Sequence, residues 1–222
     1  MPSALYDPAV RTVLDRLFGA AQGDGSLMAS LLAGLAPGAV IERMPAAELA
    51  DLAGEAYLPV APEVGTLLYT LARASRPALV VEFGTSFGIS TIHLAAALRD
   101  NGSGQIVTSE LSASKVRAAE ANVAEAGLGD LVDVRAGDAL ETLRDLPGPA
   151  DLVLLDGWNH IYLQVLRVLE PNLRPGTLII ADDTVRFADE TRDYLDHVQD
   201  PANGYTTVHL PLDDGLTLST RH

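Results

Sequence analysis

The stretch Val81-Glu82-Phe83-Gly84-Thr85-Ser86-Phe87-Gly88-Ile89-Ser90 decides the fold. It joins a continuous apolar run, residues 78–83 (ALVVEF), to a segment with helical spacing. An uninterrupted β-branched and apolar run is typical of a strand buried on both faces. Two glycines separated by three residues, Gly84 and Gly88, allow a tight turn and let a ligand approach the backbone at the helix N-terminus. The stretch therefore predicts the first strand–turn–helix unit of an α/β sheet.

Strand-like and helix-like segments alternate beyond this turn. Further strands are expected at 105–109, 131–136, 151–155 and 177–181, and helices at 90–99, 112–126, 139–146, 162–173 and 189–198. Such alternation predicts a Rossmann-like, doubly wound, mostly parallel sheet with helices on both faces. Two last strand-like runs, 205–210 and 216–220, flank a turn with Asp214-Gly215 and predict a terminal antiparallel hairpin. The α/β sheet thus has seven expected strands, and residues 1–56 are expected to form an N-terminal helical extension.

Composition restricts the classes of function. The chain has 222 residues, a formal net charge of −15 and no cysteine. A strongly acidic protein is a poor partner for nucleic acid or an anionic membrane, and thiol chemistry is excluded. No apolar run is long enough for a membrane span, and residues 1–14 lack a secretory signal, so a cytoplasmic enzyme is expected. The only lysine, Lys115, is expected to be exposed on a helix.

Two polar positions follow strands at the edge where the glycine loop lies. Glu110 ends the second strand, where a carboxylate can bind both hydroxyls of a ribose. Asp138 and Ala139 follow the third strand, where they can meet an adenine edge. Glu110 has an alternative role as an acidic residue that favours a helix N-terminus. Together with the loop, which lacks the G-x-G-x-x-G pattern of dinucleotide sites, these positions predict a nucleoside ligand.

Three aspartates follow the next two strands. Asp156 ends the fourth strand, and Asp182 and Asp183 end the fifth. Neighbouring strands lie about 4.8 Å apart, so these carboxylates are expected close together, where they would repel one another. A hard divalent cation, Mg²⁺ above all, would remove the repulsion. The alternative is that they are ordinary caps of the loops.

Four segments and the closing hairpin carry a resemblance to a known family. The chain resembles the class I S-adenosylmethionine-dependent O-methyltransferases of the catechol and caffeoyl-CoA type, over roughly residues 57–221. The matching segments are residues 58–65, 81–90, 154–162 and 174–183, with the hairpin turn at 210–218. The resemblance identifies residues 57–222 as the methyltransferase domain.

The resemblance implies a site and a reaction. S-adenosylmethionine (SAM) would give its methyl group to a hydroxyl of a small aromatic, catechol-like acceptor whose neighbouring hydroxyl is on Mg²⁺. The metal ligands would be Asp156, Asp182 and Asp183. The family also implies a homodimer. The implied cofactor-binding residues are Val60, Glu82, Gly84, Ser86, Ser90, Glu110, Asp138, Ala139 and Asp156.

Two positions depart from the family pattern. Asn159 stands where the family usually has a lysine as general base, and an amide is a poor proton acceptor. Asp183 stands where the family usually has asparagine. His160 is the nearest replacement base, so Asn159 and His160 are the catalytic candidates. The alternatives are that His160 is a loop histidine, or that Asp183 is the base rather than a ligand.

Several functions stay open at this point. The leading hypothesis is a metal-dependent O-methyltransferase. Others are a methyltransferase for an amine or carboxylate, a SAM-binding protein that has lost catalysis, and a nicotinamide-dependent enzyme. Trp158 either walls the acceptor pocket or packs, and the loop after Asp183, with Arg186 and Phe187, is expected to shape that pocket.

Overall fold

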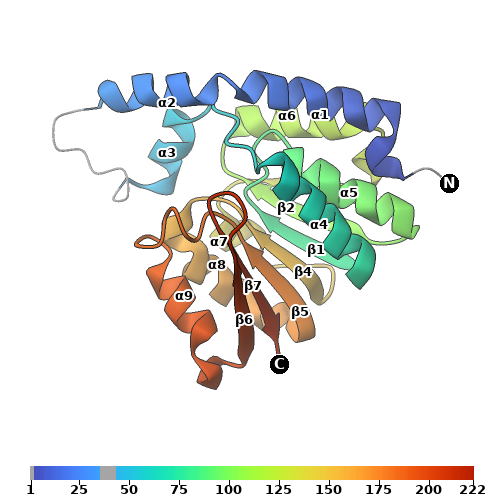
Figure 1. Ribbon diagram of the computed structural model, residues 1–222, viewed down its shortest axis with the longest axis vertical. Coiled ribbons are helices and arrows are strands. Elements are labelled where there is room, and N and C mark those ends of the chain that lie inside the picture. Colours follow the sequence, from blue (N-terminus) through green and yellow to red (C-terminus); the bar gives the residue numbers. More distant parts are fainter. Residues whose placement is uncertain (1–2, 36–43) are drawn as a thin grey trace.

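Strand β1 lies inside a seven-stranded sheet, next to its central strand β4, in the computed structural model, which describes residues 3–35 and 44–222 (Figure 1). The strands are β1 (Leu79–Phe83), β2 (Gln105–Glu110), β3 (Val132–Ala136), β4 (Ala150–Leu155), β5 (Leu173–Ala181), β6 (Tyr205–Leu210) and β7 (Leu216–Arg221). The helices are α1 (Pro8–Ala21), α2 (Asp24–Ala33), α3 (Ala46–Leu52), α4 (Pro62–Ser75), α5 (Ile89–Asn101), α6 (Ala113–Glu125), α7 (Ala139–Thr142), α8 (Tyr162–Leu169) and α9 (Arg192–Gln199).

The strand order is β3-β2-β1-β4-β5-β7-β6. The pairs from β3 to β5 are parallel, whereas β7 is antiparallel to both β5 and β6. The chain therefore winds outward from β1 through β2 to β3, returns to β4 and winds the other way. The expected doubly wound sheet with a terminal antiparallel hairpin is confirmed, and the order reverses between β1 and β4.

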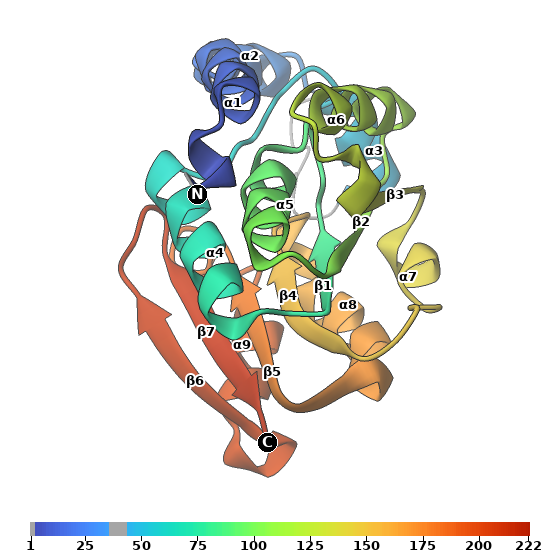
Figure 2. The same cartoon turned by 90° about the vertical axis from the view of Figure 1, so that its right-hand side faces the viewer.

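The two faces of the sheet bury two separate apolar clusters. Side chains alternate along a strand, so Val80 and Val81 point to opposite faces. Val80 belongs to a cluster with α1, α4 and α5, whereas Val81 belongs to one with α8 and α9. Figure 2 shows these helices on the two sides of the sheet. Both faces are covered, which explains why strands such as β1 and β4 are apolar throughout.

Three expected helices are shorter in the structure. The helix expected at 139–146 ends at Thr142, because Nη1 of Arg135 donates to the carbonyls of Thr142 and Asp145 at 2.7 and 2.8 Å, so these carbonyls need no further helical turn. The helix expected at 162–173 ends at Leu169, two residues before Pro171.

The helix expected at 189–198 starts only at Arg192. Before it, the backbone amides of Val185 and Arg186 both donate to the carbonyl of Asp214 in the β6–β7 turn. This ties the segment after β5 to the hairpin and delays the helix.

The N-terminal helices are joined to the sheet to different degrees. Val13 and Leu17 of α1 are buried in the same cluster as α4 and α5. Helix α2 has no fully buried residue and lies with α3 beyond the carboxyl ends of the strands (Figure 1). The division at residue 56 stays a prediction. No helix of the described residues is both long and apolar enough to cross a membrane.

Candidate active site

Gly84 stands where the strand order reverses, in the position that ligands favour in such sheets. Its φ is 101°, and a Cβ there would lie 2.4 Å from the carbonyl oxygen of Asp156. The two loops are held together by the amide of Asp156, which donates to the carbonyl of Phe83 at 2.9 Å. Only glycine fits this conformation and this approach, which is why the sequence has one here.

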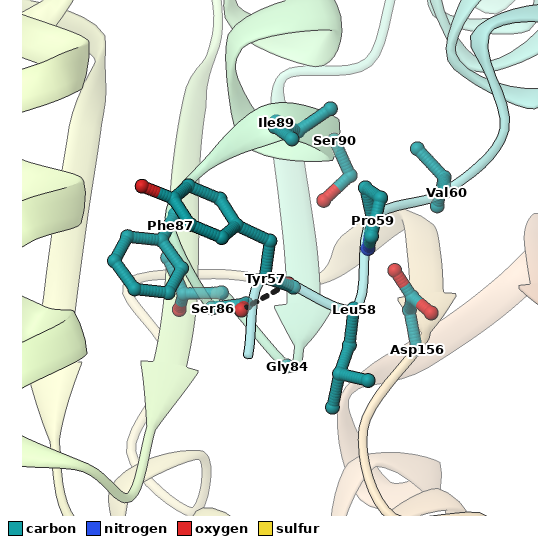
Figure 3. A pocket seen from close by; sticks show the side chains of 11 residues that line it. Tyr57, Leu58, Pro59, Val60, Gly84, Ser86, Phe87, Ile89, Ser90 and Asp156 are labelled. Carbon is teal, nitrogen blue, oxygen red and sulfur yellow. Dashed lines mark hydrogen bonds between the residues drawn. The ribbon is translucent and has the colours of Figure 1, made fainter. Parts of the chain in front are cut away.

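Ser86 links the glycine loop to the acid after β2. Its amide donates to Glu110 Oε2 at 2.8 Å, and its hydroxyl donates to the carbonyl of Tyr57 at 2.6 Å (Figure 3). The amide of Ser112 donates to the other oxygen of Glu110, also at 2.8 Å. The loop, the acid and the segment before α4 therefore form one hydrogen-bonded unit.

Glu82 lies beneath this loop and is fully buried. Ser90 donates to its Oε1 at 2.7 Å, and Thr91 and Thr108 donate to its Oε2 at 2.6 Å. Burial raises the pKa of Glu82, and the three hydroxyls act in the opposite direction. Glu82 thus supports the loop from below and does not reach the cavity described next.

A cavity of about 710 Å³ opens above the carboxyl ends of the strands, within the size range of small-molecule sites. The predicted site residues that line it are Gly84, Ser86, Glu110, Asp156, Asn159, His160, Asp182 and Asp183. Val60 and Ser90 line a smaller pocket that shares Gly84, Ser86 and Asp156 with it, and there the carboxylate of Asp156 faces the segment 58–60 (Figure 3). Asp138 and Ala139 line neither space, and Asp138 caps α7 by accepting from the amide of Leu140.

The three predicted metal ligands all line the cavity. Burial, and then the charges of Asp182 and Asp183, raise the pKa of Asp156 well above its usual range. Burial and the neighbouring Asp183 raise the pKa of Asp182 to about 7. Burial and Asp214 raise that of Asp183 to about 6. The carboxylates therefore carry the mutual repulsion that the sequence predicts.

Their arrangement is not that of a formed metal centre. Across residues 3–35 and 44–222, no group of three or more Asp, Glu, His or Cys side chains is arranged so that it could hold a metal ion. One oxygen of Asp182 accepts a hydrogen bond from the amide of Asp183 at 2.9 Å. The donor atoms suit a hard cation, but the structure does not bring them to a common point.

Strained backbone surrounds the cavity. Five described residues other than glycine have positive φ, and four of them line the cavity. These four are Leu58, Ser86, Asp183 and Asp213, with φ of 45°, 47°, 62° and 50°. Such conformations cost about 1–3 kcal/mol each and gather at ligand sites, where the surrounding structure fixes them.

The catalytic candidates lie on a short 3₁₀ turn, Asn159–Ile161, after β4. Nδ2 of Asn159 is buried without a hydrogen-bond partner. Burial lowers the pKa of His160, which favours its neutral form. Trp158 also lines the cavity, as do Arg186 and Phe187 from the loop after β5. Both catalytic candidates therefore line the same cavity as the three aspartates.

Two features of the site were not predicted from the sequence. Lys115 is only 6% exposed and lines the cavity, so its expected exposure was wrong. Asp24, Met28 and Leu32 of α2 form another part of the wall. No local motif marks the residues of α2, because they reach the cavity only through the tertiary fold, but a lone lysine one turn beyond Glu110 was an available signal.

The chain is similar to known methyltransferases. A family model described as a methyltransferase domain matches residues 81–184. A catechol O-methyltransferase of Niastella koreensis is 34% identical over 138 residues, which cover 60% of this chain and only 62% of that protein. The catechol O-methyltransferase of Sus scrofa is 30% identical over 152 residues, which cover 65% of this chain and 80% of that one.

A solved structure agrees with these relatives. The O-methyltransferase TomG of Streptomyces achromogenes, crystallised in complex with SAM, has a TM-score of 0.66 and 27% identity, and the match covers 79% of this chain and 87% of that one. The sequence and structural matches agree with the resemblance read from the motifs. This chain therefore belongs to the SAM-dependent O-methyltransferase family that includes the catechol O-methyltransferases.

Proposed function

We propose that this protein transfers the methyl group of SAM to a hydroxyl of a small, catechol-like aromatic with the help of a divalent cation. One observation carries the proposal. The glycine loop, Glu110 and the three aspartates line a single cavity at the point where the strand order reverses. That is where an α/β sheet of this kind binds a nucleotide-like ligand next to its reacting partner.

Glu110 is the residue that would recognise the ribose. The amides of Ser86 and Ser112 fix its two oxygens, and a carboxylate has further lone pairs for two ligand hydroxyls. Gly84 allows the rest of the cofactor to approach the backbone. SAM would supply the sulfonium methyl group, and the complex of TomG with SAM supports this choice of cofactor.

Asp156, Asp182 and Asp183 are the residues that would hold a magnesium ion. Their oxygens are ligands that Mg²⁺ prefers, and a bound cation would relieve the repulsion that raises their pKa values. When bound, it would position the diol and stabilise the phenolate. A bound cation would explain why three carboxylates line one cavity wall.

A residue of the turn after β4 would accept the proton of the acceptor hydroxyl. A bond forms between the acceptor oxygen and the methyl carbon, the carbon–sulfur bond breaks, and the hydroxyl proton leaves to a base. His160 is neutral near pH 7 because burial lowers its pKa, so it can accept that proton. Asn159 carries only an amide and is assigned to contact the acceptor rather than to deprotonate it.

Calorimetric titration of S-adenosylhomocysteine (SAH), with and without Mg²⁺ and a catechol, tests the proposal. Micromolar SAH binding, with catechol binding only when Mg²⁺ is present, is the expected result. The Asp182→Asn variant should keep SAH binding and lose the effect of Mg²⁺. Absence of SAH binding would overturn the proposal, and SAH binding without any effect of metal would remove the cation from it.

A second candidate is a methyltransferase for an amine or a carboxylate. Asn159 favours it, because its buried Nδ2 lacks a partner and position 159 carries an amide in place of a lysine base. Methylation of a carboxylate, which is already ionised near pH 7, needs no strong base. Turnover of carboxylates or amines with labelled SAM, and none of catechols, would favour this candidate over the first.

We also propose a homodimer, from the family resemblance, and a cytoplasmic location, from the composition. Light scattering of the purified protein tests the assembly, and a mass of one chain, 23.4 kDa, would contradict it. Cell fractionation tests the compartment.

A further inference from the structure

Lys115 is a buried cation that faces the cavity without an ionic partner. It lies in α6 and is 6% exposed. Among the described residues its ammonium makes no salt bridge and donates no hydrogen bond, and its contact is with the ring of Phe87, whose centroid is 5.6 Å from Nζ. Burying a charge is costly unless a partner offsets the cost. Since Lys115 lines the cavity, the missing partner can be a ligand.

The surroundings of Lys115 place it at the cofactor end of the cavity. Phe87 belongs to the glycine loop and stacks on Tyr57 with centroids 4.0 Å apart. Glu110 is near enough to favour the charged form of Lys115, as is Asp24. The acceptor end, with Trp158 and the aspartates, is built from the ends of β4 and β5 instead.

We propose that Lys115 is a cofactor-binding residue that donates a hydrogen bond to a ribose hydroxyl held by Glu110. This inference rests on the proposed function. An ammonium only donates and a carboxylate only accepts, whereas a hydroxyl does both. A hydroxyl between the two side chains can therefore donate to Glu110 and accept from Lys115. The pair selects a diol rather than an anion, because the nearby carboxylates of Glu110 and Asp24 would repel a negatively charged ligand.

Asp24 connects this contact to the N-terminal helices. Its Oδ2 accepts from the amide of Leu58 at 2.7 Å, so the start of α2 is tied to the segment that covers the smaller pocket. Asp24 and Glu110 both favour the charged form of Lys115, and all three residues line the cavity. A cofactor that engages Lys115 would bind beneath the cover, and the stack of Phe87 on Tyr57 would hold the ammonium in place.

The test is calorimetric binding of SAH to the wild type, Lys115→Met and Arg117→Met. Methionine keeps the apolar stem and the contact with Phe87, and Arg117 is an exposed cation on the same helix that does not line the cavity. Loss of one charge-assisted hydrogen bond predicts SAH binding about tenfold weaker or more in Lys115→Met. Arg117→Met is expected to stay within about twofold of the wild type, because surface charges are screened.

Analogues of SAH without the 2′- or the 3′-hydroxyl identify the contact. The analogue that lacks the contacted hydroxyl should bind the wild type more weakly, and Lys115→Met should weaken it no further. Equal SAH affinity in Lys115→Met and the wild type would overturn the inference alone. Weaker acceptor binding with unchanged SAH binding would assign the ammonium to the acceptor and overturn it too. A wild type that does not bind SAH would overturn the proposed function and this inference with it.

A measurement on the unmutated protein guards against a folding defect in the variant. Lys115 is the only lysine, so growth on ¹³C-lysine gives a single lysine side-chain signal by NMR. That signal should shift on saturation with SAH and stay in place with catechol alone. A lysine signal that does not respond to bound SAH would overturn the proposal.

Discussion

Gly65 of α4 packs directly on the imidazole ring of His93 in α5. A Cβ at position 65 would lie 2.7 Å from both Cε1 and Nε2 of His93. No real Cβ contact is this short, and His93 is itself buried, so its ring cannot move into solvent. The two helices approach closely here because position 65 has no side chain.

Gly65→Ala should therefore destabilise the protein, although alanine is the better helix former. Overpacking of a filled core costs about 1–3 kcal/mol, which exceeds the gain of about 1 kcal/mol from helix propensity. Urea unfolding measures the difference. Gly19→Ala in α1 is the matched control, since a Cβ there meets nothing within 4 Å, and it should stabilise the protein. A stable Gly65→Ala would show that α4 and α5 can separate.

His93 should contribute a loss of stability as the pH falls below about 6.5. Nδ1 of His93 lies 2.8 Å from the carbonyl of Ile89, which can only accept, so Nδ1 carries the proton of the neutral ring. Burial lowers the pKa of His93 below its value in the unfolded chain. Below pH 6.5 His93 therefore binds a proton more readily in the unfolded chain than in the folded protein. This difference lowers the free energy of unfolding by up to about 1.4 kcal/mol per pH unit.

Comparison with His93→Gln isolates this contribution. The free energy of unfolding of the wild type should fall relative to that of the variant between pH 7 and pH 5, because glutamine does not titrate. If the two proteins showed the same pH dependence of the free energy of unfolding, His93 would have the same pKa in the folded and unfolded states, and the prediction would be wrong. The aspartates of the cavity titrate in both proteins and cancel in the difference.

Gly84→Ala should damage the fold and the cofactor site together. Its φ of 101° disfavours alanine, and the new Cβ would lie 2.4 Å from the carbonyl oxygen of Asp156. Gly176 has a similar φ of 91° with nothing near its Cβ position, so Gly176→Ala measures the backbone strain alone. We expect Gly176→Ala to cost about 1 kcal/mol and to leave SAH binding unchanged. Gly84→Ala should cost more and weaken SAH binding, and equal effects in the two variants would contradict the role of Gly84.

Local sequence was enough to predict the sheet. The apolar run before Gly84, the helical spacing after it and the Asp214-Gly215 turn are short-range signals, and the strands were expected within one residue of their observed ends, except that β5 starts at Leu173 rather than at Thr177. Helix ends were less predictable. Helix α7 stops at Thr142 because Arg135, from another element, binds its last carbonyls.

The candidate site was predictable only where a strand end fixes it. Gly84, Glu110 and Asp156 follow strands and reach the cavity, because strand ends of a parallel sheet meet at one edge. Glu82 is turned beneath the loop by three hydroxyls from α5 and β2. The burial of Lys115 depends on the glycine loop and α2, which are distant in the chain, so its helix alone suggested an exposed side chain.

Replacement of Asn159 by lysine should raise the turnover of catechols. Position 159 lines the cavity beside Asp156, and its amide cannot accept the acceptor's proton. A lysine there would supply a base and a positive charge next to the developing phenolate. General-base catalysis contributes about 10²–10⁴-fold, so a rise of kcat/KM by tenfold or more is expected, while SAH affinity stays the same. Asn159→Met is the control, because methionine is similar in length to lysine but has no amine, and its kcat/KM for catechols should not rise.

The same variant has a second readout in stability. Burial and Asp183 raise the folded-state pKa of Asp182 to about 7, so without metal its contribution to stability is present at low pH and lost as the pH rises through 7. A lysine at position 159 would offset the negative charge that forms when Asp182 ionises. Asn159→Lys should therefore unfold at a higher temperature than the wild type at pH 8, and not at pH 5. Higher stability at pH 8 without faster catechol turnover would mean that the lysine reaches the aspartates but the acceptor is not a catechol, and that outcome would favour the amine or carboxylate reaction.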